Sequence, residues 1–368
     1  MIHTSEDGRV CTRCNSLPTK IQGSGLLYLW VPVDHTINKL IIALKKLKLI
    51  HQYLQSEQCL KINLDESNRE KFGELIKKQL SPKELRETQA LWIDEQREPR
   101  FQDFSQVTSL ENFVSLAQAE WLIDLLDTER LTSYFQPIVC ARNPEQIFAQ
   151  EALLRGFDEQ GELISPGRIF SQAEAAGLVF QLDLLARQSA IRQAHLHQLQ
   201  VPLFINFSPT SVYDPATCLR MTVQAIDEVG IPHKHIVFEV MESEQPPDIA
   251  HLIRILAFYR EAGFLIALDD FGTGYSNLDL IDRLRPDFIK LDMHLIRNVH
   301  LDPYKALVTE KLLEIAQLLN IRTIAEGIEC QEELEWVRDR NATYVQGFLI
   351  AKPTTPPLRQ LRVSSLSQ

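Results

Sequence analysis

The sequence predicts an α/β protein: a (β/α)8, TIM-barrel-like domain preceded by a small α/β module. Three observations lead to this fold class. From Tyr134 onward, short apolar runs alternate with helical stretches, as expected for parallel strands joined by helices. Eight such runs are present, which is the number that closes a barrel. A doubly wound open sheet is the alternative, but the Gly-rich phosphate loop that usually follows its first strand is absent.

Composition and charge limit what the chain can do. Its 368 residues are 45% hydrophobic, enough for one large domain and a smaller one. The net charge of -11 argues against polymeric nucleic acid or a membrane surface as partner, since both need a basic face. Met1–Val10 lacks the apolar core of a signal peptide, and no apolar run approaches the roughly 20 residues that span a bilayer. Six scattered cysteines do not form a disulfide framework, so a cytoplasmic location is expected.

The pattern of apolar runs and helical stretches in residues 1–95 predicts the small α/β module. Apolar runs at Leu26–Val31 and Cys59–Leu64 are typical of strands. Thr36–Gln55 and Asn68–Trp92 have helical periodicity, and Pro82 marks a break or a new start within the second. The expected order is therefore β-α-β-α, and its position before the barrel suggests a regulatory role.

A lone CxxC in this module, formed by Cys11 and Cys14, allows a zinc site or a redox pair. Zinc needs four ligands and a second CxxC is missing, so an incidental pair of thiols is the preferred interpretation. The polar residues 96–109 are expected to be a linker. Residues 110–358 then form the barrel domain, beginning with an amphipathic helix over Leu110–Asp127, and 359–368 form a C-terminal tail.

The barrel domain carries the regular pattern. Its expected strands are Tyr134–Val139, Ile147–Leu154, Leu203–Phe207, Ile236–Val240, Leu265–Leu268, Phe288–Leu291, Thr323–Ala325 and Tyr344–Ile350. Helical sequence fills most of the gaps between them, at Leu182–Gln198, Cys218–Val229, Ile249–Ala262, Tyr304–Asn320 and Glu332–Arg338.

Polar residues gather at the carboxyl ends of these strands, which meet on one face of a barrel. They are Glu151, Arg155, Asn206, Glu239, Glu242, Asp269, Asp270, Lys290, Asp292, Glu326, Glu329 and Gln346. One acid alone at such a place is usually a surface residue or a helix cap. Several carboxylates brought together repel one another in a cleft, so they need protons or cations. Hard oxygen ligands select Mg²⁺, Mn²⁺ or Ca²⁺.

The most informative local feature is the adjacent pair Asp269 and Asp270, followed by Gly272 and Gly274. Successive strand residues point to opposite faces, so both acids can serve one site only where the backbone turns, and glycines permit that turn. One carboxylate can then bridge two metals that clamp a phosphoryl group. Lys290 would hold the nucleophilic water or offset phosphate charge, and a structural Lys–Asp ion pair is the alternative.

These motifs resemble the EAL domain of cyclic di-GMP phosphodiesterases over Tyr134 to Pro353, and the N-terminal module resembles no family we recognise. The motifs that carry the resemblance are Phe135-Gln136-Pro137-Ile138, Glu151-Ala152-Leu153-Leu154-Arg155, Asn206-Phe207-Ser208-Pro209, Phe238-Glu239-Val240-Met241-Glu242-Ser243, Asp269-Asp270-Phe271-Gly272-Thr273-Gly274-Tyr275-Ser276, Ile289-Lys290-Leu291-Asp292, Ala325-Glu326-Gly327-Ile328-Glu329, Gln346-Gly347-Phe348 and Lys352-Pro353.

The resemblance implies metal-dependent hydrolysis of cyclic di-GMP to linear pGpG, a step in bacterial signal transduction. It implies two ions per site, Mg²⁺ or Mn²⁺, held by Glu151, Asn206, Glu239, Asp269, Asp270 and Glu326. Glu326 would be the general base and Lys290 would position the water. Contacts to the substrate would come from Gln136, Leu153, Arg155, Asp292, Glu329 and Gln346. Glu242 would steady the loop that bears the Asp pair, and a homodimer is expected.

Departures from the family pattern leave a second function open. The family often has Trp, Thr and Ser at the positions of Gly156, Met241 and Asn277. Met241 puts in question whether the loop that bears the Asp pair is well ordered. All expected ligand, base and lysine positions are filled, which favours catalysis over a cyclic di-GMP receptor without turnover. The third candidate function is a two-metal hydrolase that acts on another phosphodiester. Ca²⁺ should inhibit, because its larger coordination sphere disturbs a tight two-metal geometry.

Overall fold

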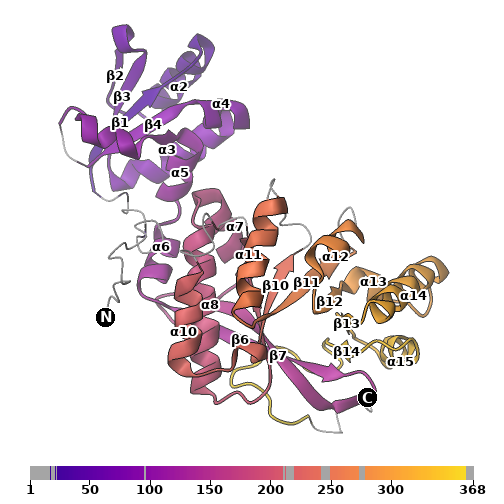
Figure 1. Ribbon diagram of the computed structural model, residues 1–368. Helices are drawn as coiled ribbons and strands as arrows, with labels where there is room; N and C mark the ends of the chain where they lie inside the picture. The colour runs from indigo at the N-terminus through magenta and orange to yellow at the C-terminus, as the bar shows by residue number, and fades with distance from the viewer. Residues whose placement is uncertain are drawn as a thin grey trace. The chain divides into compact units, whose positions relative to one another are not determined.

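The computed structural model describes residues 23–94, 97–209, 219–241, 249–272 and 278–361, together with Leu17, Ile21 and Val212. The chain divides into two compact units. The small unit holds Asn15–Glu129 and Ile164–Val179, and the barrel unit is built from Arg130–Leu163 and Phe180–Gln368. The predicted fold class, a barrel with a small α/β module before it, is confirmed (Figure 1).

A five-stranded antiparallel sheet forms the small unit, in the order β2–β3–β1–β4–β5. Its strands are β1 (Gly25–Trp30), β2 (His51–Leu54), β3 (Cys59–Leu64), β4 (Gln89–Ile93) and β5 (Thr108–Ser109). Its main helices are α2 (Asp34–Lys46), α3 (Glu66–Gln79), α4 (Pro82–Glu87) and α5 (Leu110–Ala117), with a short turn η1 (Gln55–Glu57). Because side chains alternate along β1, Leu27 and Leu29 join one apolar core while Leu26 and Tyr28 join the core on the opposite face.

The predictions for this unit are right for β1 and β3 and wrong for the ends of two helices. The helix predicted over Thr36–Gln55 stops at Lys46, and His51–Leu54 forms edge strand β2. The helix predicted over Asn68–Trp92 is two helices followed by β4. Periodicity alone cannot distinguish a helix from a strand in a short apolar run. Here β2 pairs with β3 and β4 pairs with β1, and this pairing makes both segments strands.

The boundaries of the two compact units differ from the predicted domain boundaries. Residues 96–109, predicted as a linker, contain the 3₁₀ helix η2 (Phe101–Gln106) and β5, which pairs with β4. The helix predicted over Leu110–Asp127 is two helices, α5 and α6 (Glu120–Asp127), and side chains of α5 complete the core of the small unit. Helix α7 (Pro166–Ala176) also belongs there, and Gln172 donates a hydrogen bond to the carbonyl of Ser115 at 3.3 Å.

Eight strands close the barrel unit, in the order β6–β14–β13–β12–β11–β10–β9–β7, with β6 paired to β7. The strands are β6 (Leu131–Cys140), β7 (Asn143–Phe157), β9 (Leu203–Asn206), β10 (Ile236–Met241), β11 (Leu265–Phe271), β12 (Phe288–Leu291), β13 (Arg322–Ala325) and β14 (Tyr344–Val345), and a two-residue strand β8 (Leu163–Ile164) extends the sheet beyond β7. Strand β6 runs antiparallel to both neighbours, because it joins β7 through a tight hairpin instead of a helix. The barrel prediction missed this reversal, and β14 is shorter than the predicted Tyr344–Ile350.

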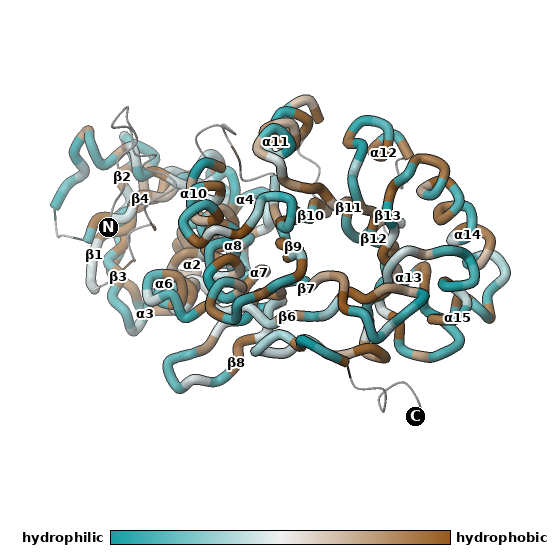
Figure 2. The backbone as a smooth tube through the Cα atoms, turned by 60° about the horizontal axis from the view of Figure 1, so that its bottom comes forward, coloured by the Kyte–Doolittle hydropathy of each residue, from teal (hydrophilic) through white to brown (hydrophobic). Residues whose placement is uncertain are grey.

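Helices surround these strands (Figure 1). They are α8 (Val179–Leu196), α10 (Arg220–Val229), α11 (Ile249–Glu261), α12 (Leu278–Leu284), α13 (Met293–Ile296), α14 (Pro303–Leu318) and α15 (Gln331–Asp339), with a short turn η4 (His233–His235) before β10. One core fills the space between strands and helices. Figure 2 shows hydrophobic stretches along β11 and β12, consistent with strands that are covered on both faces.

A second, smaller core fills the interior of the barrel. It includes one inward-facing residue from each of several strands, namely Ile138, Ala149, Phe204, Val237, Ala267, Phe288 and Ile324. The next residue along most of these strands faces outward, as Ile205, Phe238 and Leu268 do. The residue after that faces inward again, so the interior is built in layers. This apolar layer supports the layer above it, where the polar residues lie.

Candidate active site

The polar layer is formed by residues two positions after the apolar layer. Glu151, Asn206, Glu239, Asp269, Lys290 and Glu326 follow Ala149, Phe204, Val237, Ala267, Phe288 and Ile324 at this spacing. The strand period of two therefore turns all six polar side chains toward the barrel interior, near the carboxyl ends of five strands and, for Glu151, in the middle of the longer β7. Glu239 is completely buried and Lys290 is 1% exposed. The structure thus brings together the sequence-predicted residues of these strands.

Lys290 lies at the centre of this layer. Its Nζ is 2.7 Å from Glu239 Oε1, 2.9 Å from Glu326 Oε1 and 3.0 Å from Asp269 Oδ1. Glu151 Oε1 is slightly farther, at 3.5 Å. One ammonium group therefore faces four carboxylates, and the cluster keeps an excess of negative charge.

The pKa values reflect this imbalance. Burial, with the charge of Glu151 added, raises the pKa of Glu239 well above its usual range, and burial does the same for Glu326. Burial alone would lower the pKa of Lys290, but the surrounding carboxylates raise it well above its ordinary value. Lys290 is thus held charged, while the acids would ionise fully only with more positive charge beside them.

The donor set fits divalent cations. Oxygen atoms of Glu151, Glu239 and Asp269 lie within 4.8 Å of one another, and so do oxygens of Asp269, Asp270 and Glu326. Asp269 is common to both groups. In addition, Oε2 of Glu239 is buried and makes no hydrogen bond within the described part of the chain. A buried carboxylate oxygen without a donor is costly, and a hard cation would satisfy it.

The turn that brings Asp270 beside Asp269 is made by Asp270 itself and by Gly272. Asp270 has φ +53° and Gly272 has φ +103°, and the pairing of β11 with β12 is irregular between Leu268 and Phe271. The backbone N–H of Asp270 donates to Asp269 Oδ1 at 2.9 Å. Burial, together with the charges of Asp269 and Asp292, raises the pKa of Asp270 to about 6. The predicted turn is present at Gly272, Asp270 itself is also left-handed, and Gly274 lies outside the described residues.

Amide side chains hold Glu151 from two sides. Gln346 Nε2 donates to Glu151 Oε2 at 2.7 Å, and Asn206 Nδ2 lies 3.4 Å from Oε1. Gln136 lies opposite Glu151 in the β6–β7 register, and its Nε2 donates to the carbonyl of Ala351 at 3.1 Å. The antiparallel β6 therefore places Gln136 beside the polar layer from the middle of a strand.

Leu153 and Arg155 follow Glu151 on the same side of β7, because each is two residues further along. The Arg155 guanidinium lies 5.2 Å from the centre of the Tyr134 ring and donates to the carbonyl of Leu154 at 2.7 Å. This hydrogen bond engages one of its five N–H donors, so the guanidinium can also donate to an anionic ligand.

Asp292 and Glu329 follow the polar-layer residues Lys290 and Glu326 by two and three positions, and their partners were not suggested by the sequence. Asp292 Oδ1 accepts from the backbone N–H of His294 at 2.7 Å and lies 2.6 Å from its Nδ1. Glu329 forms an ion pair with Arg297. His294 and Arg297 carried no strand-end signal, because they lie on or after the short helix α13. The predicted residues Glu242, Cys11 and Cys14 lie outside the described residues.

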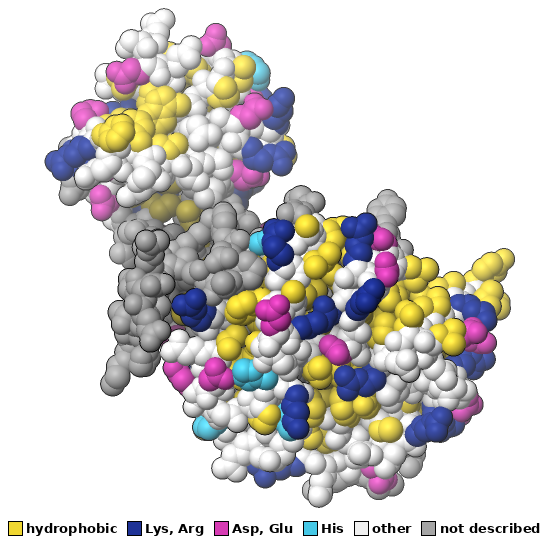
Figure 3. All heavy atoms as spheres, in the orientation of Figure 1, with side chains coloured by type: hydrophobic (Ala, Val, Ile, Leu, Met, Phe, Trp, Pro, Cys, Tyr) yellow, Lys and Arg dark blue, Asp and Glu magenta, His cyan; other side chains and the backbone are white. Residues whose placement is uncertain are grey.

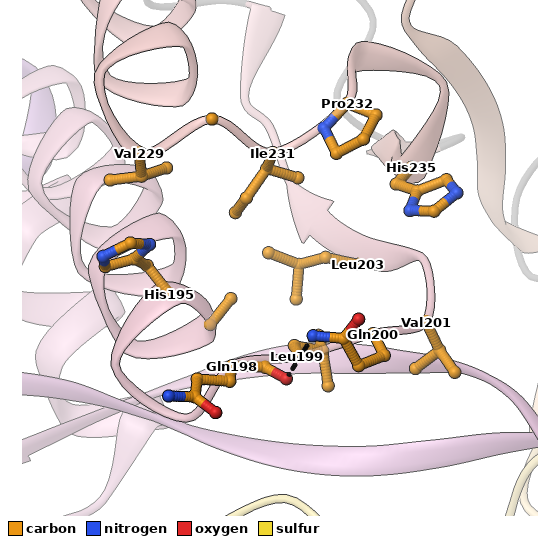
Figure 4. A pocket seen from close by; sticks show the side chains of 12 residues that line it. His195, Gln198, Leu199, Gln200, Val201, Leu203, Val229, Ile231, Pro232 and His235 are labelled. Carbon is orange, nitrogen blue, oxygen red and sulfur yellow. Dashed lines mark hydrogen bonds between the residues drawn. The ribbon is translucent and has the colours of Figure 1, made fainter.

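A pocket of about 320 Å³ lies at the other end of the barrel strands (Figure 4). Leu203, the first residue of β9, lines it together with Ile231 and His235, which precede β10. Figure 4 shows Val229, Ile231 and Leu203 on its apolar side and His195 and His235 at its margins. Asn206 and Glu239, by contrast, stand at or near the carboxyl ends of the same strands. This pocket is therefore separate from the polar layer.

Comparison with known proteins agrees with the geometry. The EAL domain family matches residues 119–353. The "Probable cyclic di-GMP phosphodiesterase PdeG" of Escherichia coli (strain K12) is 31% identical over 245 residues, covering 66% of this chain and 48% of that protein. The "Cyclic di-GMP phosphodiesterase NbdA" of Pseudomonas aeruginosa is 28% identical, covering 68% of this chain and 32% of that protein. The chain thus spans about half or less of the length of these relatives.

A solved structure shows the same fold. The standalone versatile EAL protein from Vibrio cholerae O395, crystallised in its c-di-GMP bound form, aligns with a TM-score of 0.57 and 34% identity. The alignment covers 65% of this chain and 98% of that chain. The family match covers more than half of the chain and includes every strand that contributes to the polar layer. The chain belongs to the EAL domain family.

Proposed function

We propose that this chain hydrolyses cyclic di-GMP to linear pGpG with two divalent cations, Mg²⁺ or Mn²⁺, and so lowers a bacterial second messenger. The observation that carries the proposal is the shared position of Asp269 in two groups of carboxylates. Two cations bridged by one carboxylate suit in-line displacement at a phosphodiester. The names of the relatives PdeG and NbdA support cyclic di-GMP as the substrate.

The residues of the polar layer would divide the two cations between them. Glu151 and Glu239 would hold one, Asp270 and Glu326 the other, and Asp269 both. The family resemblance adds Asn206 to the first of these groups. Bound there, the cations would polarise the phosphoryl oxygens and lower the pKa of a bound water. The buried Oε2 of Glu239 supports this assignment.

Glu326 and Lys290 would transfer the proton and balance the charge. Glu326 would take the proton from the attacking water, as the family resemblance implies, once bound cations offset the burial that raises its pKa in their absence. Lys290, 2.9 Å from Glu326, would hold that water in position. Attack at phosphorus opens one of the two phosphodiester bonds of the ring, and the product is the linear dinucleotide.

Substrate contacts would come from the rim of this layer. Arg155 has N–H donors suited to a phosphate oxygen, and Leu153 lies on the same side of β7. The other contacts, implied by the family resemblance, are Gln136, Asp292, Glu329 and Gln346. Gln346 supports this role, because its Oε1 is buried without a hydrogen-bond partner in the described residues.

Turnover of cyclic di-GMP by the purified chain tests the proposal. We expect pGpG in the presence of Mg²⁺ or Mn²⁺, little product when Ca²⁺ replaces them, and a rate at least about 100-fold lower for Glu326→Gln. Glu310→Gln is the matched control, because Glu310 pairs with Arg340 on the surface. Equally little product from wild type and Glu326→Gln would contradict the proposal. Tight nucleotide binding without turnover in Mn²⁺ would favour the receptor function instead.

A homodimer and a cytoplasmic location complete the proposal. Helix α14 exposes an apolar row, Tyr304, Leu307 and Val308, at the helical spacing of one face, and Leu318 extends it. Figure 3 shows hydrophobic side chains gathered at the margin of the barrel unit where Figure 1 draws α14. The described cysteines Cys59, Cys140 and Cys330 are free thiols, which suits a reducing compartment. None of the described helices is long and apolar enough to cross a membrane.

A further inference from the structure

Glu333 is a buried carboxylate that lies outside the polar layer, on α15. It is 1% exposed. Its Oε1 accepts from the backbone N–H of Asn298 at 2.9 Å, and its Oε2 accepts from the N–H of Glu329 at 2.9 Å and from that of Cys330 at 3.4 Å. Burying a carboxylate is costly unless donors surround it, and here three backbone donors do so.

A role in capping α15 explains only part of this arrangement. Glu333 is the third residue of α15 and completes a capping box with Cys330, which accounts for the Cys330 N–H. The other two donors come from elsewhere. Glu329 lies three residues after Glu326 in the loop from β13, and Asn298 follows α13 in the segment that begins at Asp292 after β12. One side chain therefore joins the loops that follow two neighbouring strands of the polar layer.

These two loops approach each other closely at Gly327. A Cβ at Gly327 would lie 2.4 Å from Cβ of Met293, and its φ of +67° also favours glycine. Arg297 Nη2 donates to the carbonyl of Gly327 at 3.2 Å, across the same junction. The backbone N–H of Glu326 donates to the carbonyl of Leu291 at 3.0 Å. The position of Glu326 thus depends on how the loop after β13 is held against the segment after β12.

We infer that Glu333 is a positioning residue of the proposed phosphodiesterase: it holds the Glu329 and Asn298 backbones together so that Glu326 stays directed at Lys290. The inference rests on the proposed function. The two carboxylate oxygens of Glu333 point to different loops, so both must be acceptors. Glutamine has the same shape but only one acceptor, and its NH₂ group would face an N–H on one side. Glu333→Gln therefore releases one loop while it preserves packing.

The test compares Glu333→Gln with wild type and with Glu335→Gln, an exposed glutamate on the same helix that accepts from Gln331. We expect kcat for cyclic di-GMP to fall about 10- to 100-fold in Glu333→Gln, because small misplacements of a reacting group cost that much. KM should change less than kcat, since Arg155 and the rim residues other than Glu329 keep their contacts. Glu335→Gln should match wild type.

Two measurements without substrate keep this inference separate from the proposed function. Mn²⁺ titration of the nucleotide-free proteins by calorimetry should show weaker binding to Glu333→Gln, and hydrogen exchange should be faster at Asn298 and Glu329. If wild type does not hydrolyse cyclic di-GMP, the proposed function is wrong, but the Mn²⁺ titration and hydrogen exchange still test whether Glu333 positions the two loops. Unchanged Mn²⁺ affinity, or a lower melting temperature with unchanged kcat, would show that Glu333 only caps α15 and would overturn the inference.

Discussion

At the scale of single residues, Lys290 is the counter-ion on which the polar layer depends. It contacts Glu239, Asp269 and Glu326 directly, with Glu151 close by, and all are buried or nearly so. A buried charge that loses its partner is expensive, because water cannot replace the lost interaction. Lys290 and the proposed cations therefore have overlapping tasks, since each neutralises the same carboxylates.

Replacing this lysine should make stability depend on metal. Lys290→Met keeps the volume of the side chain but removes its charge, so we expect the metal-free protein to lose about 3–5 kcal/mol. The loss should be smaller at pH 5 than at pH 8, because acids with raised pKa values take up protons and become neutral as the pH falls. Thermal unfolding with and without Mn²⁺ measures both effects, and Mn²⁺ should raise the melting temperature of the variant more than that of wild type.

The exposed Lys311, which pairs with Glu314, provides the control for this prediction. Lys311→Met should change stability by no more than about 0.5 kcal/mol. A metal-free Lys290→Met protein as stable as wild type at pH 8 would show that the acids are already neutral and need no counter-ion.

At the scale of elements, α4 shows how a short helix is held by one carboxylate. Glu84 accepts from Lys39 Nζ at 2.8 Å, from the N–H of Ser81 and from Thr36. These donors, Lys39 first, hold the pKa of Glu84 well below its usual range. Pro82 and the capping box of Ser81 with Glu84 start the helix. The six residues of α4 are too few to persist alone, so these contacts determine whether the helix forms.

Because its pKa is lowered on folding, Glu84 stabilises the small unit above its unfolded pKa of about 4.3. That stabilisation is lost as the pH falls through the lowered pKa of the folded state. We expect the melting temperature of wild type to drop from pH 5 to pH 3 by more than that of Glu84→Gln, which has no charge to lose. Tryptophan fluorescence follows this unit well, since Trp30, Trp92 and Trp121 lie in it. Glu87→Gln, at an exposed pair with Lys83, should behave as wild type. Parallel pH curves for wild type and Glu84→Gln would contradict the prediction.

The elements of the barrel were predictable because their physical signals are local. Apolar runs located all eight strands, and polar residues within or just after most of these runs indicated the candidate site. Two features depend on contacts between distant residues and had no local signal. The left-handed Asp270 lies where the pairing of β11 with β12 is irregular, and the partners Arg297 and Glu333 follow from the approach of two loops. The reversal of β6 had a local signal that the prediction missed, because only a short hairpin joins β6 to β7.

At the scale of the whole molecule, the family match and the compact units do not coincide. The match begins at residue 119, yet residues up to Glu129 and Ile164–Val179 pack with the small unit. Within that unit, α5, which precedes the match, contacts α7, which lies inside it. In the sequence, α7 lies between β7, which carries Glu151, and α8, so the small unit contains a segment that interrupts the barrel unit along the chain. We propose a regulatory role for the small unit from this chain connectivity.

The exposed row on α14 leads to a prediction about assembly. Tyr304 is 84% exposed and Leu307 59%, and an apolar row of this kind is costly to leave in water. If it forms the interface of the proposed homodimer, the twofold axis places each copy of the row against the other. Leu307→Glu would then set two carboxylates into an apolar interface, and sedimentation velocity at micromolar concentration should show a monomer where wild type is a dimer.

Ile253→Glu is the matched control, because Ile253 is an exposed isoleucine on α11, away from α14. It should sediment as wild type does. A dimer that persists unchanged in Leu307→Glu would place the interface elsewhere, and a wild-type monomer at all concentrations would exclude the homodimer. The interface would also have a thermodynamic signature: since dimerisation stabilises only the folded state, the melting temperature of wild type should rise with protein concentration, whereas that of Leu307→Glu should not.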